Sequence, residues 1–142
     1  MTTIAYRDGY LAADTAVFDR GVYCGEVIKI IKLEDGSLCG AAGALGDMQK
    51  FLAWLREGQH GDRPTFEDGG TEGIVIRPDG TVWWYGKDTS AQIAGTHQAI
   101  GSGFALAMGA MDAGASALTA LEICARRDVY TRAPITLLKL GA

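Results

Sequence analysis

The chain has 142 residues, of which 48% are apolar and 21% are charged, and its formal net charge at pH 7 is -4. This length and composition are typical of one globular domain, taken here as residues 1–142, with a core of ordinary size. The acidic balance argues against a nucleic-acid-binding surface. No apolar run has the length of a membrane span, and the N-terminus lacks the basic and apolar regions of a signal peptide.

The three cysteines, Cys24, Cys39 and Cys124, are odd in number and lie in apolar stretches. This usage indicates reduced core thiols of a cytoplasmic protein and not a disulfide framework. The two histidines, His60 and His97, stand alone and lack the spacing of metal ligands. The sequence therefore predicts neither a metal nor a cofactor.

In chain order, three Asp-Gly pairs lie between short runs of β-forming residues. Asp-Gly favours the positive-φ turn of a tight hairpin, so we expect three hairpins. They join 3–6 to 10–13, 27–33 to 38–42, and 73–76 to 81–85. Two of the strands are apolar on neighbouring residues, which is typical of strands buried on both faces. These residues are Ile28, Ile30 and Ile31 in one strand and Val82, Trp83 and Trp84 in the other.

Three helices are expected between and after the hairpins. Asp47 is predicted to cap the first, in which apolar residues at 48, 51, 52 and 55 follow the helical spacing and which ends at Gly58. The second, over 103–112, is apolar nearly all round and should therefore be buried. Ser116 is predicted to cap the third, and a last strand is expected over 129–138. With a polar surface loop at 58–70, these patterns predict a mixed α/β (α+β) domain with antiparallel hairpins.

Thr2 is the first candidate for chemistry. Met1 precedes a small residue, so we expect it to be removed, which would leave Thr2 at the N-terminus. A free N-terminal threonine carries a hydroxyl nucleophile and an α-amine with a reference pKa of about 7.7–8.0. That amine can accept the hydroxyl proton near neutral pH, which activates the nucleophile. If Met1 is retained, Thr2 has no such base.

Four blocks follow Thr2 in order along the chain. They are TTIAYRDGYLAAD at 2–14, VIKIIKLEDG at 27–36, AAGALGDMQKFLAWL at 41–55, and AIGSGFALAMGAM at 99–111 with ALEICARRDVYT at 120–131. Together they resemble the proteasome β-subunit family, and most closely its bacterial HslV-type subunits. The resemblance covers nearly the whole chain. It implies a four-layer αββα sandwich of the N-terminal-nucleophile (Ntn) hydrolase type, with two mostly antiparallel sheets between helical layers.

The resemblance also implies the parts of a catalytic site. Thr2 resembles the family nucleophile, and Asp14 and Lys29 resemble the pair beneath it. An ammonium in an apolar strand needs a partner, and its charge would keep the nearby α-amine unprotonated. Gly43 resembles the residue whose backbone N–H stabilises the oxyanion, where the lack of a side chain lets the substrate approach.

A second set of residues would surround the α-amine, orient it and relay protons; it consists of Ser102, Asp128 and Thr131. An apolar pocket for the substrate side chain is expected beside the nucleophile, lined by Val27, Ile31, Ala41 and Leu45. Structural alternatives stay open for the polar residues. Lys29 could extend from a strand edge, Ser102 could cap a helix, and Asp128 could belong to a charge cluster at a helix end.

The function implied by the resemblance is that of a threonine-type endopeptidase acting on peptides or unfolded proteins. It further implies a homo-oligomer, a ring in the family, with an ATPase unfoldase as its partner. Two alternatives remain. The chain could be a non-catalytic structural or interaction subunit. It could also hydrolyse small amides, because the family has a further helix where this chain has only the loop at 58–70.

Overall fold

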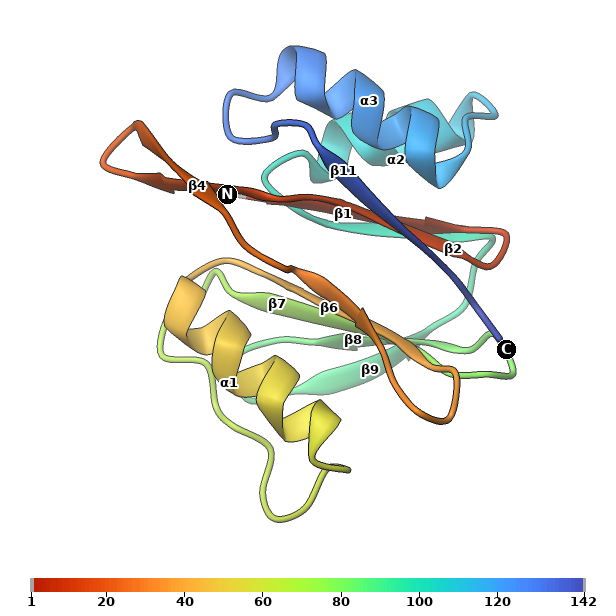
Figure 1. The fold of residues 1–142 in the computed structure, drawn as a ribbon. Coiled ribbons are helices and arrows are strands. Elements are labelled where there is room, and N and C mark those ends of the chain that lie inside the picture. Colours follow the sequence, from red (N-terminus) through yellow and green to blue (C-terminus); the bar gives the residue numbers. More distant parts are fainter. Residues whose placement is uncertain (1, 142) are drawn as a thin grey trace.

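The structure is a computed structural model that describes residues 2–141. The chain folds into a four-layer αββα sandwich, as expected (Figure 1). Helices α2 (Phe104–Asp112) and α3 (Ala117–Arg127) form one outer layer, and α1 (Leu45–Arg56) forms the other. Two antiparallel sheets lie between these layers.

The sheet beside α2 and α3 has the strand order β10-β1-β2-β11. Its strands are β1 (Thr3–Arg7), β2 (Tyr10–Asp14), β10 (His97–Gly101) and β11 (Ile135–Lys139). The sheet beside α1 has the order β5-β6-β7-β8-β9. Its strands are β5 (Ile30–Lys32), β6 (Leu38–Ala42), β7 (Glu72–Ile76), β8 (Val82–Tyr85) and β9 (Ser90–Ile93). A separate hairpin, β3 (Ala16–Asp19) and β4 (Val22–Glu26), projects from one end of the sandwich (Figure 1).

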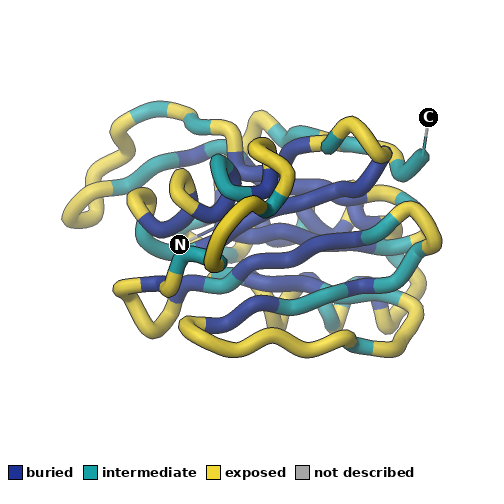
Figure 2. Tube along the Cα trace, turned by 90° about the horizontal axis from the view of Figure 1, so that it is seen from below, coloured by how far each residue is buried: buried dark blue, intermediate teal, exposed yellow. Residues whose placement is uncertain are grey.

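The alternation of side chains along the strands divides the core into three apolar layers. In β1, Ile4 and Tyr6 pack between the two sheets, whereas Ala5 packs against α2 and α3. The layer under α1 is aromatic and includes the fully buried Phe51 and Phe66. Burial runs through the central strands and gives way to exposure at the turns (Figure 2). The packed sheets thus form a firm support for the strand ends where the candidate site lies.

The three predicted hairpins are confirmed as β1–β2, β5–β6 and β7–β8. The second is shorter than predicted, because β5 begins only at Ile30 and Ile28 is 61% exposed. Burial on both faces was therefore wrong for Ile28. The hairpin β3–β4 and the strands β9 and β10 were not predicted, since they are short and most of their side chains are exposed or only partly buried.

The three predicted helices are present, with two corrections. Asp47 does not cap α1, whose N-cap is Ala44; Asp47 lies within the first turn and is buried. Helix α2 is not buried all round, because Phe104 is 47% and Leu106 is 40% exposed. Ser116 caps α3 as predicted, and its hydroxyl accepts a hydrogen bond from the Thr119 N–H.

The loop at 58–70, the last strand and the cysteines agree only in part with the predictions. Residues 58–70 contain no helix or strand, in agreement with the predicted loop. The last strand begins only at Ile135, because residues 129–134 form a turn and an irregular segment. Cys39 and Cys124 are buried core thiols, but Cys24 lies on the projecting hairpin and is exposed.

Candidate active site

Thr2 is held at the start of β1 by the neighbouring strand β10. The pairing of β1 with β10 places Thr3 opposite Gly101, so that Thr2 lies beside Ser102. The Ser102 N–H donates to the Thr2 carbonyl oxygen at 2.7 Å, and the Thr2 nitrogen donates to Ser102 Oγ at 3.2 Å. A β-carbon at Gly101 would collide with the Thr2 carbonyl group, so this close approach requires glycine. Thr2 is 1% exposed, and Met1 lies outside the described residues.

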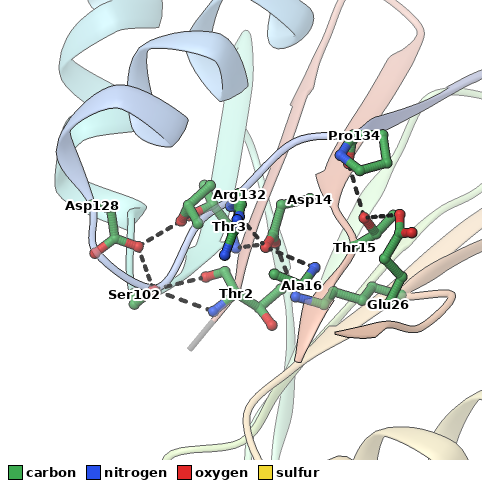
Figure 3. A network of polar contacts seen from close by, with 12 residues as sticks. Thr2, Thr3, Asp14, Thr15, Ala16, Glu26, Ser102, Asp128, Arg132 and Pro134 are labelled. Atoms are coloured by element: carbon green, nitrogen blue, oxygen red, sulfur yellow. Dashed lines mark hydrogen bonds and ion pairs between the residues drawn. The ribbon is translucent and has the colours of Figure 1, made fainter. Parts of the chain in front are cut away.

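Ser102 and Asp128 form the centre of a hydroxyl network beside Thr2 (Figure 3). Asp128 Oδ2 accepts hydrogen bonds from Ser102 Oγ, at 2.7 Å, and from Thr131 Oγ1, at 2.5 Å. Thr131 Oγ1 in turn contacts Thr3 Oγ1. The carboxylate therefore orients Ser102, which touches the Thr2 nitrogen directly. The structure brings together the three residues that the sequence assigned to the surroundings of the amine.

Asp14 and Lys29 form a buried ion pair on another side of Thr2 and Thr3. Lys29 Nζ lies 3.0 Å from Asp14 Oδ1, and the two side chains are 1% and 0% exposed. The Thr3 N–H also donates to Asp14 Oδ1, while the N–H groups of Ala16 and Arg132 donate to Asp14 Oδ2. Asp14 ends strand β2, so the carboxylate is fixed by the sheet, by the start of β3 and by the segment before β11 (Figure 3).

Burial lowers the pKa of Lys29, and the negative charge of Asp14, with the hydrogen bond to it, opposes that decrease. A buried ammonium needs such a partner to stay charged, because an unpaired buried charge is costly. Lys29 also lines the cavity that contains Thr2. If Met1 is removed, that positive charge would disfavour a second positive charge on the Thr2 nitrogen.

Thr2 opens into a cavity of about 90 Å³ with mostly apolar walls. Val27 and Leu45, two of the four predicted pocket residues, line it. Ile31 and Ala41 do not; they belong to the core layer between the sheet and α1, because alternation along β5 and β6 turns them to that face. Further walls come from the projecting hairpin and from α1. These further residues are Ala16, Val17, Phe18 and Met48.

Gly43 lies on the rim of the same cavity, just after β6. Its φ of +132° is a conformation that glycine adopts most readily, and an added β-carbon would stand 2.6 Å from the Thr71 Cα. Within residues 2–141, no atom accepts a hydrogen bond from the Gly43 N–H. An unpaired backbone donor at the edge of a cavity can stabilise negative charge that develops on a bound group.

Asp47 and Thr71 support the turn at Gly43, and sequence reasoning missed this role. Asp47 is 5% exposed and accepts hydrogen bonds from Thr71 Oγ1 and from the N–H groups of Glu67 and Asp68. Thr71 Oγ1 accepts from the Ala44 N–H at 3.1 Å. Burial raises the pKa of Asp47, but the hydrogen bonds from these donors together lower it by more, so that the net shift is downward. The signal in the sequence was an aspartate directly after a glycine turn, which resembles a helix cap.

Glu72 is a second residue that the sequence did not reveal. It begins β7, and its carboxylate accepts from Trp84 Nε1 at 2.9 Å and from the Gly101 N–H at 3.4 Å. The contact joins the two sheets immediately before Ser102. Glu72 therefore helps to fix the strand that holds Thr2.

Across residues 2–141, no group of three or more His, Cys, Asp or Glu side chains is arranged to hold a metal ion. None of the three helices in this range is long and apolar enough to cross a membrane.

Comparison with known proteins identifies the fold but not the family. No protein-family model matches the chain, and no curated protein sequence matches it. Solved structures do match. BPH of Thiobacillus denitrificans in complex with epoxomicin superimposes with a TM-score of 0.69, over 99% of either chain, at 18% identity. Another structure of Thiobacillus denitrificans BPH gives a TM-score of 0.66 at 19% identity, over 99% of this chain and 98% of that one. At this identity the similarity shows a shared fold.

Proposed function

We propose that the chain is a threonine-type endopeptidase of the proteasome β-subunit type, with Thr2 as its nucleophile. The observation that carries the proposal is the position of Thr2. Its nitrogen contacts Ser102, and it shares a cavity with the Lys29 ammonium and with the unpaired N–H of Gly43. These are the parts that an N-terminal nucleophile needs: a base, a charge that keeps the base neutral, and an oxyanion donor.

In the proposed reaction, the free α-amine of Thr2 accepts the proton of the Thr2 hydroxyl as Oγ1 attacks the peptide carbonyl carbon. The carbonyl oxygen becomes negatively charged and is stabilised by the Gly43 N–H. The C–N bond then breaks, and the protonated amine gives its proton to the leaving nitrogen. Water, deprotonated by the same amine, hydrolyses the ester and restores Thr2.

Two groups of residues prepare the amine for this role. The Ser102–Asp128 network holds the nitrogen in one orientation, since Ser102 Oγ is itself fixed by the carboxylate. The Lys29 ammonium makes protonation of the amine less favourable. Lys29 keeps its own place through Asp14, which accepts from it at 3.0 Å. This division of labour accounts for two separate polar clusters next to one threonine.

The cavity indicates the substrate side chain. With a volume of about 90 Å³ and walls that include Val27, Leu45 and Met48, it suits one apolar side chain of modest size. Pockets that enclose a whole small molecule are larger, typically about 300–1,000 Å³. The cavity therefore favours a peptide, which places only one side chain in it.

The similarity to BPH in complex with epoxomicin supports the same proposal. We expect this chain to react with a peptide epoxyketone, a class of reagent that needs both the hydroxyl and the free amine of an N-terminal threonine. The proposal includes the expected homo-oligomer, which in the proteasome family is a ring, an ATPase unfoldase as partner, and a cytoplasmic location.

The experiment is peptide cleavage by the native protein and by Thr2→Ala. Native protein should cleave peptides with a leucine or a valine before the scissile bond. The variant should show no turnover, while its circular dichroism spectrum and its melting temperature stay close to native. Turnover at the native rate in Thr2→Ala would overturn the proposal. So would a native protein that cleaves only small amides.

A further inference from the structure

A second cavity shares the wall residue Phe18 with the one that contains Thr2. Its volume is about 340 Å³. Asp128 and Thr131, which belong to the network around the Thr2 nitrogen, also line this second cavity. It therefore adjoins the site on the side of the amine, whereas Lys29 and Gly43 line the first cavity.

The second cavity is basic. Arg126, Arg127 and Arg132 line it, and Asp128 is its one acidic residue, so its net formal charge is +2. The Asp128 carboxylate already accepts from two hydroxyl groups. Within residues 2–141, none of the three arginines has a carboxylate within 4.0 Å. Three guanidinium groups thus border one cavity without a protein counter-charge in contact.

The aromatic side chains of the projecting hairpin help to fix this arrangement. The Arg132 guanidinium lies over the ring of Tyr23, 4.1 Å from its centroid. Phe18 packs edge-on against both Tyr23 and Tyr130, with ring centroids 5.8 and 5.7 Å apart. Cation–π stacking restrains an arginine while leaving its N–H donors free for an anion. The guanidinium of Arg132 is consequently held in place with its N–H groups available to an anionic ligand.

The chemistry of the proposed reaction says which part of a peptide comes here. The α-amine must deliver its proton to the leaving nitrogen, so the leaving segment has to pass the amine side of Thr2. That side carries Ser102 and Asp128 (Figure 3). Asp128 is also a wall of the basic cavity. The side chain before the scissile bond occupies the apolar cavity instead. The two cavities therefore serve opposite sides of the bond.

We infer that the cavity lined by Arg126, Arg127 and Arg132 is a subsite for a carboxylate on the leaving side of the scissile bond. This inference rests on the proposed peptidase function and adds the substrate class. Guanidinium groups bind carboxylates through charge-assisted, often bidentate hydrogen bonds. The carboxylate has two sources, an acidic side chain in the leaving segment or the C-terminal carboxylate of a short one.

A purely structural role makes a different prediction. Arg126 and Arg127 lie in the last turn of α3, where positive charge interacts favourably with the helix dipole. Arg56 holds the same position in the last turn of α1, on the opposite face of the sandwich. A helix-end effect would be equal at both helices and would not depend on the substrate. Arg56→Gln is therefore the matched control.

The test uses quenched fluorescent peptides that are identical before the scissile bond. In the first pair both peptides have an amidated C-terminus, and one has aspartate after the bond where the other has asparagine. In the second pair both peptides end shortly after the bond, one as a free acid and the other as an amide. Native protein should cleave at least one carboxylate peptide with a kcat/KM roughly fivefold higher than its neutral partner. The pair that shows the preference identifies the source. High salt should reduce it.

The ratio of kcat/KM for the carboxylate peptide to kcat/KM for its neutral partner should fall toward one in the double variant Arg126→Gln/Arg127→Gln. It should remain at its native value in Arg56→Gln. Arg127→Glu should abolish the preference, because it brings the formal charge of the cavity to zero. Equal kcat/KM for both members of both pairs, with cleavage otherwise intact, would overturn the subsite and leave the peptidase proposal standing. Failure to cleave any peptide, together with no modification of Thr2 by a peptide epoxyketone, would overturn the peptidase proposal and the subsite with it.

Discussion

Replacing Asp14 by asparagine should destabilise the fold strongly, because the carboxylate is surrounded only by donors. Asp14 is fully buried and accepts from the Lys29 ammonium and from the N–H groups of Thr3, Ala16 and Arg132. An asparagine amide presents one oxygen and one NH₂ group. The NH₂ group would therefore face two of these donors and leave them without an acceptor. Lys29 would also lose its counter-charge.

The size of the effect follows from these contacts. Breaking a buried ion pair from one side costs about 3–5 kcal/mol, and a buried N–H left without an acceptor costs about 1–3 kcal/mol. Asp14→Asn should therefore cost about 5 kcal/mol or more, which is comparable to the whole stability of a small domain. Lys29→Met leaves the three backbone donors of Asp14 in place, so it should cost about 3 kcal/mol.

Urea denaturation at two pH values tests this reasoning. The pKa of Lys29 is lowered from 10.5 in the folded protein, and Asp14 is what opposes the decrease. Without Asp14 the folded-state pKa of Lys29 should fall further. The unfolded chain then binds more protons than the folded one between the lowered pKa and the unfolded value near 10.5, so the stability of Asp14→Asn should rise as the pH is raised through that interval. Its deficit relative to native protein should shrink over that range.

Two results would refute this explanation. One is a Lys29→Met variant as stable as the native protein at neutral pH. The other is an Asp14→Asn deficit that grows as the pH is raised. If Asp14→Asn does not fold at all near pH 7, then Lys29→Met and the double variant carry the test. The double variant should lose less stability than the sum of the single losses, since each change removes the same pair.

Three further predictions concern other residues. Gly43→Ala should lower kcat by about 10²–10³-fold, because the added methyl group must displace the turn and its N–H donor; steady-state kinetics with unchanged kcat would contradict this. Asp47→Asn should lower both kcat and stability, the latter by about 1–3 kcal/mol. The lowered pKa of Asp47 contributes stability that is present above 3.8 and is lost as the pH falls through the folded value, so the stability gap between native protein and variant should narrow in acid. A thiol reagent should modify Cys24 alone in folded protein, since burial raises the pKa of Cys39 to about 12 and that of Cys124 to about 11; rapid modification of three thiols before denaturation would contradict the burial.

The local elements were largely predictable from sequence because turn and helix signals are local. Asp-Gly at positions 8–9, 35–36 and 79–80 located three hairpins, and Ser116 located the start of α3. The hairpin β3–β4 was missed because most of its side chains are exposed and its turn residues, Arg20 and Gly21, lack a familiar hairpin motif. For α2, an apolar sequence suggested full burial, but the structure leaves one face open.

The candidate site shows the same limit at longer range. Resemblance to a family placed Thr2, Asp14 and Lys29 together, although nothing in their spacing alone requires it. The supporting contact of Asp47 with Thr71 spans 24 positions and depends on where the loop at 58–70 returns to the sheet. The contact of Glu72 with Gly101 joins two sheets. Such contacts follow from tertiary packing and leave no periodic trace in the sequence.

The pocket residues illustrate why a strand register matters. Val27 and Ile31 lie on either side of Lys29 in the sequence, yet only Val27 reaches the cavity. The chain is not a regular strand between them, since β5 begins at Ile30. Simple alternation across Lys29 therefore assigned Ile31 to the wrong face.

The most direct measurement is the intact mass of the native protein and of Thr2→Ala after incubation with a peptide epoxyketone. If Thr2 is the nucleophile and its α-amine the base, the native mass should correspond to the chain without Met1 plus one inhibitor, and the variant should gain no inhibitor. An unmodified native protein that retains Met1 would contradict the proposed catalytic role of Thr2. So would an adduct that persists in Thr2→Ala.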